Sequence, residues 1–166
     1  AEKIRAADKV IFPGVGEASS AMASLRQNNL DGVIKDLQQP VLGICVGMQL
    51  LCLHSEENNT DCLGIVPVAV KRFVAGEGRI KIPQVGWNTI HNLQSPLFAG
   101  VQEASYIYNV HSYYAEQSEH TIASCHYGVE YAAAVKKDNF YGVQFHTEKS
   151  AETGDRIIKN FLELQP

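Results

Sequence analysis

The sequence predicts a single α/β domain whose sheet has a parallel centre and an antiparallel extension. Strands alternate with helices over the first third of the chain, which is the order typical of parallel sheets. From Gly64 onward, short runs rich in β-branched and aromatic residues follow one another, as in antiparallel sheets. With 166 residues, 45% of them hydrophobic and 19% charged, the chain is long enough for one domain with its own core.

The first third contains periodic apolar positions separated by turn residues. Ala18, Met22 and Leu25 recur at helical spacing, which predicts a helix around them. Val41–Ile44 is apolar without a break, as expected of a strand that is buried on both faces. In chain order, the expected elements are a short helix at Ala1–Ala7, a strand at Val10–Phe12, a helix at Glu17–Asn28, a short helix capped by Asp31, a strand at Val41–Ile44 and a helix at Val46–His54.

The remaining two thirds are predicted to be mostly strands. A turn is expected at Val74–Arg79, between two of these runs. The final segment, "SAETGDRIIKNFLEL", is predicted to be an amphipathic helix capped by Ser150. The apolar face of this helix is made by Ile157, Ile158, Phe161 and Leu162. The expected strands lie in "IVPVAVKRF", "QVGWNTI", "SYIYNVHSYY", "HTIASCHY", "YAAAVKK" and "FYGVQFH".

The composition argues against several classes of function. A net charge of −4 provides no basic footprint for nucleic acid, and no apolar run is long enough for a membrane span. The start, "AEKIRAADKV", lacks the layout of a secretory signal. The four cysteines have neither zinc spacing nor a dense disulfide framework, so we expect reduced thiols in a cytoplasmic protein, without a metal or cofactor.

The segment Gly43-Ile44-Cys45-Val46-Gly47 has the form of a nucleophile elbow, a sharp strand-to-helix turn with the nucleophile at its apex. Glycines are needed on both sides because a Cβ there would clash with neighbouring backbone. The dipole of the following helix stabilises a thiolate, and the N–H of Val46 faces the position of an oxyanion. A buried turn that holds an unreactive cysteine fits the same residues, so the elbow by itself leaves both interpretations open.

A base for Cys45 is expected in the segment Phe145-His146-Thr147-Glu148. In an extended segment, side chains two residues apart project to the same side, so Glu148 would orient the imidazole of His146. The pair follows the apolar run "YGVQF", at a strand end where active sites of α/β proteins gather. Together with Cys45 it predicts a cysteine hydrolase. No acidic residue stands in a comparable arrangement near His54, His91, His120 or His126.

The segment Pro13-Gly14-Val15-Gly16 follows the first predicted strand. It is either a plain turn that ends this strand or a flexible backbone that offers a second oxyanion donor opposite Cys45, most simply at Gly14.

These motifs resemble the class I glutamine amidotransferases, which use a cysteine triad. The resemblance covers essentially the whole chain and rests on "PGVG", "GICVGMQLL", "GWN", "VHSYY" and "FHTEKS". It implies a three-layer, flavodoxin-like α/β fold. The family begins with a further strand and helix that have no counterpart here, which implies that 1–166 is one amidotransferase domain, partial at its N-terminus. An exposed apolar strand edge and self-association of the shortened chain are then expected.

The resemblance also implies roles for individual residues. Cys45 would attack the side-chain amide of L-glutamine to form a thioester and ammonia, with His146 as base and then acid, and Glu148 orienting His146. The oxyanion would be bound by backbone at Gly14, Val15 and Val46, and the substrate by Gln49. Thr147 stands where the family usually has proline, and its β-branched side chain is expected to keep the segment extended.

Within the family, the chain is most similar to subunits that pass ammonia to a (β/α)8-barrel cyclase, which makes imidazole glycerol phosphate in histidine biosynthesis. The residues expected near this heterodimer interface are Trp87, Asn88, Tyr108 and Lys149. The two aromatic residues among them also fit a purely structural place in the core. Two other functions stay open: an amidotransferase subunit for another acceptor such as chorismate, and a non-catalytic docking module.

Overall fold

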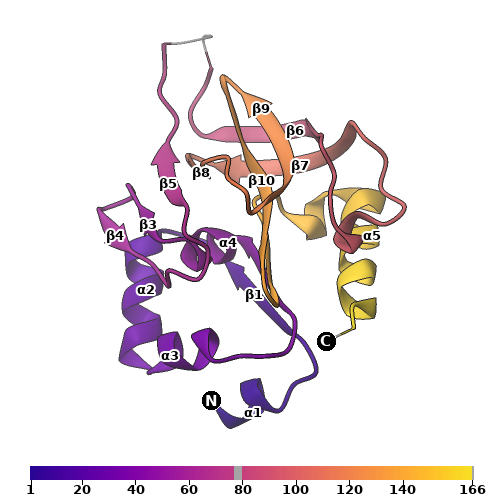
Figure 1. The fold of residues 1–166 in the computed structure, drawn as a ribbon. Helices are drawn as coiled ribbons and strands as arrows, with labels where there is room; N and C mark the ends of the chain where they lie inside the picture. The colour runs from indigo at the N-terminus through magenta and orange to yellow at the C-terminus, as the bar shows by residue number, and fades with distance from the viewer. Residues whose placement is uncertain (77–79, 166) are drawn as a thin grey trace.

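The computed structural model describes residues 1–76 and 80–165 of the chain (Figure 1). The strands are β1 (Val10–Gly14), β2 (Val41–Cys45), β3 (His54–Ser55), β4 (Thr60–Asp61), β5 (Ala69–Arg72), β6 (Gln84–Ile90), β7 (Ser105–His111), β8 (Tyr113–Ala115), β9 (Thr121–Tyr127), β10 (Val129–Lys137) and β11 (Phe140–Val143). The helices are α1 (Glu2–Arg5), α2 (Ala18–Gln27), α3 (Leu30–Lys35), α4 (Val46–Leu51) and α5 (Ala151–Glu163). Two 3-10 turns, η1 (Pro96–Phe98) and η2 (Thr147–Lys149), complete the set.

The main sheet is mixed, as predicted. Its order is β1-β2-β11-β10-β8-β5-β3-β4, and β9 pairs with β10. β1, β2 and β11 are parallel to one another and lie together at one end, whereas the pairs formed by β10 are antiparallel. β6 and β7 form a separate two-stranded sheet. Because parallel strands end at the same edge of a sheet, β2 and β11 deliver the residues that follow them to one place.

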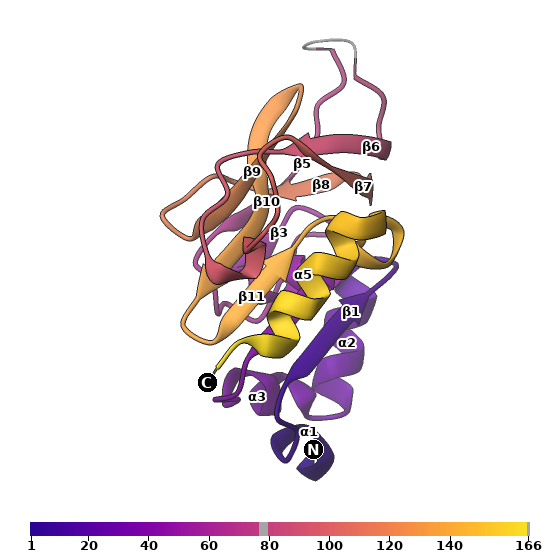
Figure 2. The same ribbon diagram turned by 90° about the vertical axis from the view of Figure 1, so that its right-hand side faces the viewer.

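Helices cover both faces of the parallel strands. In Figure 2, α5 lies in front of β11 and β1, and α2 lies behind them. Every residue of β2 is buried, which explains its unbroken apolar run. On α5, Ile157 and Phe161 are fully buried, whereas Leu162 of the predicted apolar face is 55% exposed.

Three local expectations differ from the structure. The helix predicted to reach His54 ends at Leu51, and His54 instead lies in β3. The third helix is preceded by Asn29 in the left-handed conformation (φ 53°) rather than by Asp31, because a positive φ is tolerated best by asparagine among non-glycine residues. Ser150 lies at the N-cap position of α5, but its hydroxyl donates to the carbonyl of His146 instead of capping the helix.

The turn predicted at Val74–Arg79 is present at residues 75–76, while residues 77–79 lie outside the described part of the chain.

Among the described residues, no helix is both long and apolar enough to cross a bilayer.

One edge of the main sheet is formed by β1, in agreement with the expected exposed strand edge. β1 stands at the end of the strand order, and Ile11 is 42% exposed. Self-association through this edge stays a prediction.

Gly154 connects the packing of α5 to the position of η2. A Cβ at residue 154 would overlap the carbonyl oxygen of Thr147, which belongs to the backbone of η2 and cannot move independently. Close packing of helix and turn at this point therefore fixes where the residues of η2 lie.

We expect Gly154→Ala to lower the free energy of unfolding by about 1–3 kcal/mol, because the backbone of η2 or α5 has to shift. Gly32→Ala is the matched control, since a Cβ at helix position 32 meets nothing within 4 Å, and it should be neutral or stabilising by up to about 1 kcal/mol. Urea unfolding of both variants measures the difference. Equal stabilities of the two variants would contradict the proposed packing constraint.

Candidate active site

Cys45 lies at the apex of the predicted elbow, between β2 and α4. Its backbone has φ 55° and ψ −115°, a conformation that costs a non-glycine residue about 1–3 kcal/mol. A Cβ on Gly43 would lie 2.7 Å from the carbonyl oxygen of Gly47, and one on Gly47 would overlap the carbonyl oxygen of Phe12. Both glycines are thus required by close backbone contact, as the sequence predicts.

His146 and Glu148 meet, but not in an extended segment. Residues 147–149 form the 3-10 turn η2, so the expectation that Thr147 keeps the segment extended is wrong. The imidazole Nδ1 of His146 lies 2.8 Å from Oε1 of Glu148. Because a carboxylate accepts hydrogen bonds, Nδ1 carries the proton and Nε2 is left with a free lone pair. The pair can therefore act as an oriented base.

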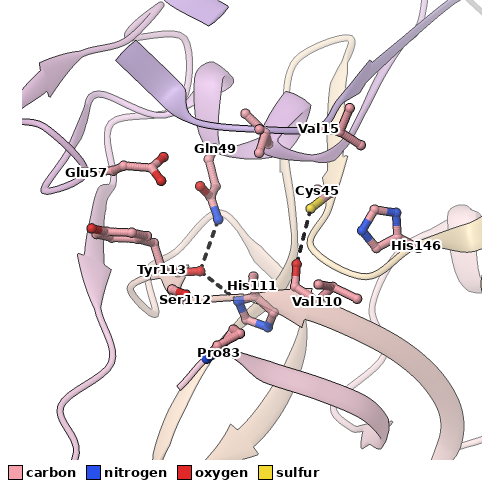
Figure 3. Close-up of a pocket in the computed structure, with 12 residues that line it drawn as sticks. Val15, Cys45, Gln49, Glu57, Pro83, Val110, His111, Ser112, Tyr113 and His146 are labelled. Atoms are coloured by element: carbon pink, nitrogen blue, oxygen red, sulfur yellow. Dashed lines mark hydrogen bonds between the residues drawn. The ribbon is translucent and has the colours of Figure 1, made fainter. Parts of the chain in front are cut away.

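Cys45 and His146 open into one cavity of about 320 Å³ (Figure 3). Gln49, one turn into α4, lies on its wall, and Glu57 provides a carboxylate at the other end. The remaining lining residues are Val15, Gly16, Val46, Pro83, Val110, His111, Ser112 and Tyr113. This size and this mixture of apolar walls with a few polar groups suit a small polar ligand.

The thiol of Cys45 is protonated at neutral pH in this state. Burial raises its pKa to about 11, although the backbone N–H of Val46 lowers it. The sulfur donates to the carbonyl of Val110 at 3.8 Å, and this bond is available only to the neutral thiol. A ligand or a partner that brings the protonated imidazole of His146 close to the sulfur would favour the thiolate.

The segment after β1 lies beside the elbow, because Gly14 is in register with Cys45. Gly14 packs beneath the turn, and a Cβ there would lie 2.7 Å from the backbone nitrogen of Gly47. Val15 and Gly16 are the residues of this segment that line the cavity, and Gly16 has a φ of +97°. The expected glycine, Gly14, is thus next to the cavity rather than in its wall.

The four residues expected at a partner interface lie on or next to the β6–β7 sheet. Trp87 and Tyr108 are paired across the two strands, with ring centroids 5.5 Å apart, and the Lys149 ammonium lies 5.8 Å from the Tyr108 ring centroid. Trp87 is 55% exposed, so a place in the core is excluded for it. The side chain of Asn88 instead donates to the carbonyl of His126.

Four lining residues that carry polar groups were not expected from the sequence: Glu57, His111, Ser112 and Tyr113. The run "VHSYY" contains the end of β7 and the residues after it, so its place at a strand end could have indicated His111 and the two residues that follow. No local pattern marks Glu57, which reaches the cavity from the turn after β3. Contrary to expectation, His54 has a carboxylate in an arrangement comparable to that of His146: its Nδ1 lies 2.8 Å from Asp61 across the β3–β4 pair, outside the cavity lining.

His111 fixes the wall opposite Cys45. Its Nδ1 donates to the carbonyl of Tyr113 at 2.7 Å, and the same oxygen accepts from Nε2 of Gln49 at 3.0 Å (Figure 3). On its other side, Nε2 of His111 lies 3.3 Å from the hydroxyl of Tyr131. Burial lowers the pKa of His111 to about 4, so the ring is neutral at physiological pH.

Comparisons with known proteins agree with this fold and identify its family. Residues 2–164 match the family described as glutamine amidotransferase class-I. The chain is 56% identical over 163 residues to the imidazole glycerol phosphate synthase subunit HisH of Bacteroides fragilis, covering 98% of this chain and 83% of that protein. The HisH subunits of Bacteroides thetaiotaomicron and Shewanella sediminis are 52% and 49% identical, with 83% and 75% of their lengths covered.

Solved structures show the same architecture at low sequence identity. A glutamine amidotransferase crystal structure has a TM-score of 0.70 at 15% identity, covering 98% of this chain and 81% of the other. A glutamine amidotransferase of Thermotoga maritima has a TM-score of 0.62 at 17% identity, covering 94% and 63%. The chain belongs to the class I glutamine amidotransferases and, within them, to the family of the HisH subunits.

The depressed pKa of His111 makes stability depend on pH. Between the folded pKa of about 4 and the usual value of 6.5, the unfolded chain binds a proton that the folded chain does not. Stability therefore falls as the pH drops from 6.5 to 4, by roughly 3 kcal/mol from this residue. In His111→Asn, the side-chain amide can still donate to Tyr113 but cannot titrate, so this part of the pH dependence should vanish.

Urea unfolding between pH 7 and pH 4 measures this effect. His126→Asn, at an exposed histidine, controls for loss of an imidazole. Parallel stability curves for the wild-type chain and His111→Asn would show that His111 is not buried as a neutral ring.

Proposed function

We propose that the chain hydrolyses L-glutamine to glutamate and ammonia through a thioester on Cys45, and delivers the ammonia to a cyclase subunit with a (β/α)8 barrel. The observation that carries the proposal is the convergence of the elbow cysteine and the His146–Glu148 pair on one cavity. Residues 1–166 act in it as one amidotransferase domain, without a cofactor. The four buried free thiols suit a cytoplasmic protein.

The chemistry follows from the proton positions. Nε2 of His146 takes the thiol proton, and the sulfur attacks the side-chain amide carbon of glutamine. The C–N bond breaks as the imidazolium returns that proton to the leaving nitrogen, which departs as ammonia. His146 then deprotonates a water that cleaves the thioester, releasing glutamate and the thiol. Glu148 holds the imidazole and stabilises its cationic form.

The remaining groups bind the substrate and the oxyanion. The backbone N–H of Val46 is one oxyanion donor, and the segment Gly14–Gly16, at Gly14 or Val15, supplies the second. Gln49 binds the substrate. Glu57, the carboxylate at the far end of the cavity, is placed to pair with the α-ammonium group of glutamine.

The exposed face of the β6–β7 sheet is the docking surface for the cyclase. Val85, Trp87 and Tyr106 are 59%, 55% and 63% exposed on it, a concentration of apolar and aromatic side chains that is typical of interfaces. Lys149 lies next to this face, over the Tyr108 ring, whereas Asn88 neighbours Trp87 in β6 with its side chain on the opposite face of the sheet. The relatives are named as subunits of imidazole glycerol phosphate synthase, so we infer that the ammonia enters histidine biosynthesis.

Glutamine hydrolysis by the wild-type chain is expected to rise when the cyclase and its nucleotide ligand are added. Cys45→Ala should lose at least about 10³-fold of this activity, because no other group can form the thioester. Cys125→Ala, at another buried free thiol outside the cavity, is the matched control and should stay active. Ammonia release is measured by a coupled assay with glutamate dehydrogenase.

Undiminished release in Cys45→Ala would exclude Cys45 as the nucleophile. Absence of release under every condition, with binding to the cyclase intact, would favour a docking module. Stimulation by a chorismate-using partner instead of the cyclase would identify a different acceptor.

Trp87→Ala is expected to weaken binding of the cyclase by about 10- to 100-fold, since an aromatic residue at the centre of an interface contributes about 1.4–2.8 kcal/mol. Leu53→Ala removes an apolar side chain of nearly equal exposure, 53%, that lies between α4 and β3. Titration calorimetry with the purified cyclase compares the two variants. Equal affinities would show that the β6–β7 face is not the docking surface.

A further inference from the structure

Gln144 connects the candidate nucleophile to the candidate substrate-binding residue inside the molecule. It directly follows β11 and is fully buried. Its Oε1 accepts from Nε2 of Gln49 at 2.9 Å, and its Nε2 lies 3.9 Å from the sulfur of Cys45. A buried carboxamide between these two side chains is not explained by the triad.

The orientation of both carboxamides is fixed by one backbone carbonyl. The oxygen of Tyr113 can only accept, and it receives both Nδ1–H of His111 and one N–H of Gln49. The nitrogen of Gln49 therefore faces this wall, and its second N–H requires an acceptor, which is the oxygen of Gln144. The nitrogen of Gln144 must then point to Cys45.

This arrangement of hydrogen bonds leaves one polar group of each carboxamide available for the reaction. The oxygen of Gln49 has no role in the chain of bonds just described, so it is free to accept an N–H of the substrate. The Nε2–H of Gln144 is directed at the Cys45 sulfur from the interior, on the side that solvent does not reach.

The contacts of the sulfur must change when the thiol ionises. The carbonyl of Val110 accepts from the neutral thiol but repels a thiolate, so this contact is lost on ionisation. A carboxamide N–H, in contrast, forms a stronger hydrogen bond with an anion than with a neutral acceptor. Gln144 and the backbone N–H of Val46 are then the donors on the sulfur.

We propose that Gln144 has two functions in glutamine hydrolysis: it donates to the Cys45 thiolate, and it positions Gln49 so that the oxygen of Gln49 faces the substrate. The first makes Gln144 a catalytic residue, since it contacts the reacting sulfur, and the second makes it a positioning residue. The proposal rests on the proposed function, in which Cys45 is the nucleophile.

Gln144→Glu separates the two functions. The carboxylate keeps an acceptor for Gln49 but replaces the N–H near Cys45 with a negative oxygen. We expect the rate of Cys45 alkylation by iodoacetamide at pH 8 to fall at least about tenfold, and the midpoint of its pH profile to rise by about one unit or more. The kcat for glutamine should fall at least about tenfold, while KM stays within about twofold.

Gln144→Met is a second variant that introduces no buried charge. It lacks both the donor and the acceptor, so alkylation should again slow down, and KM should also rise because Gln49 is free to rotate. Gln117→Glu is the control for the same substitution at an exposed glutamine, which donates to Ser124 and to the carbonyl of Tyr131, outside the cavity lining. It should leave the alkylation profile of Cys45 unchanged.

Mass spectrometry of the Cys45 peptide reports alkylation of this cysteine alone. If folded Gln144→Glu and Gln144→Met show the same pH profile of Cys45 alkylation as the wild-type chain, the proposal is wrong. A lower melting temperature together with an unchanged alkylation profile would also overturn it, because it would show a purely structural role. If Gln144→Glu does not fold, the profile of Gln144→Met decides. If the alkylation profiles of the Gln144 variants shift but Cys45→Ala still hydrolyses glutamine at the full rate, the contact between Gln144 and Cys45 is supported. The proposed function, in which Cys45 is the nucleophile, is then refuted.

Discussion

The close approach of backbone at the elbow is the constraint on which the rest of the site depends. Gly47 lies so near the carbonyl of Phe12 that no side chain fits between β1 and the start of α4, and Gly43 is packed against Gly47 in the same way. This packing forces Cys45 into a positive φ and directs its side chain into the cavity. Strain of this kind persists only where the surrounding structure fixes it from several sides, as the buried strand β2 and its neighbours do here.

The parallel pairing of β1, β2 and β11 positions the other elements of the site relative to the elbow. Gly14 stands next to Cys45 because β1 pairs with β2, and His146 arrives from the neighbouring strand β11. A helix begins directly at the elbow, which places Gln49 one turn along, over the cavity. The packing of Gly154 against Thr147 then fixes η2, and with it the carboxylate of Glu148. Residues from widely separated parts of the sequence thus meet because three strands end at the same edge.

The direction of each hydrogen bond determines the chemistry of the cavity wall that lies opposite Cys45. One carbonyl, that of Tyr113, fixes the proton of His111 and the amide orientation of Gln49, and through Gln49 that of Gln144. Each of these groups is buried, so an unpaired donor or acceptor would cost about 1–3 kcal/mol. The wall is therefore hydrogen-bonded throughout and carries no charge, which suits a cavity for a small polar ligand.

The sequence by itself determined the elbow, its two glycines, the His146–Glu148 pair and the order of strands and helices, because each depends on residues close together in the chain. It also indicated the family through several such motifs. Only the tertiary structure decided that the turn after His146 is a 3-10 turn, that Trp87 is exposed on a separate sheet, and that Gly16 rather than Gly14 lines the cavity. The tertiary structure alone also placed three further residues at the site: Glu57, His111 and Gln144. Their positions depend on contacts between distant segments, and local residue patterns carry no record of such contacts.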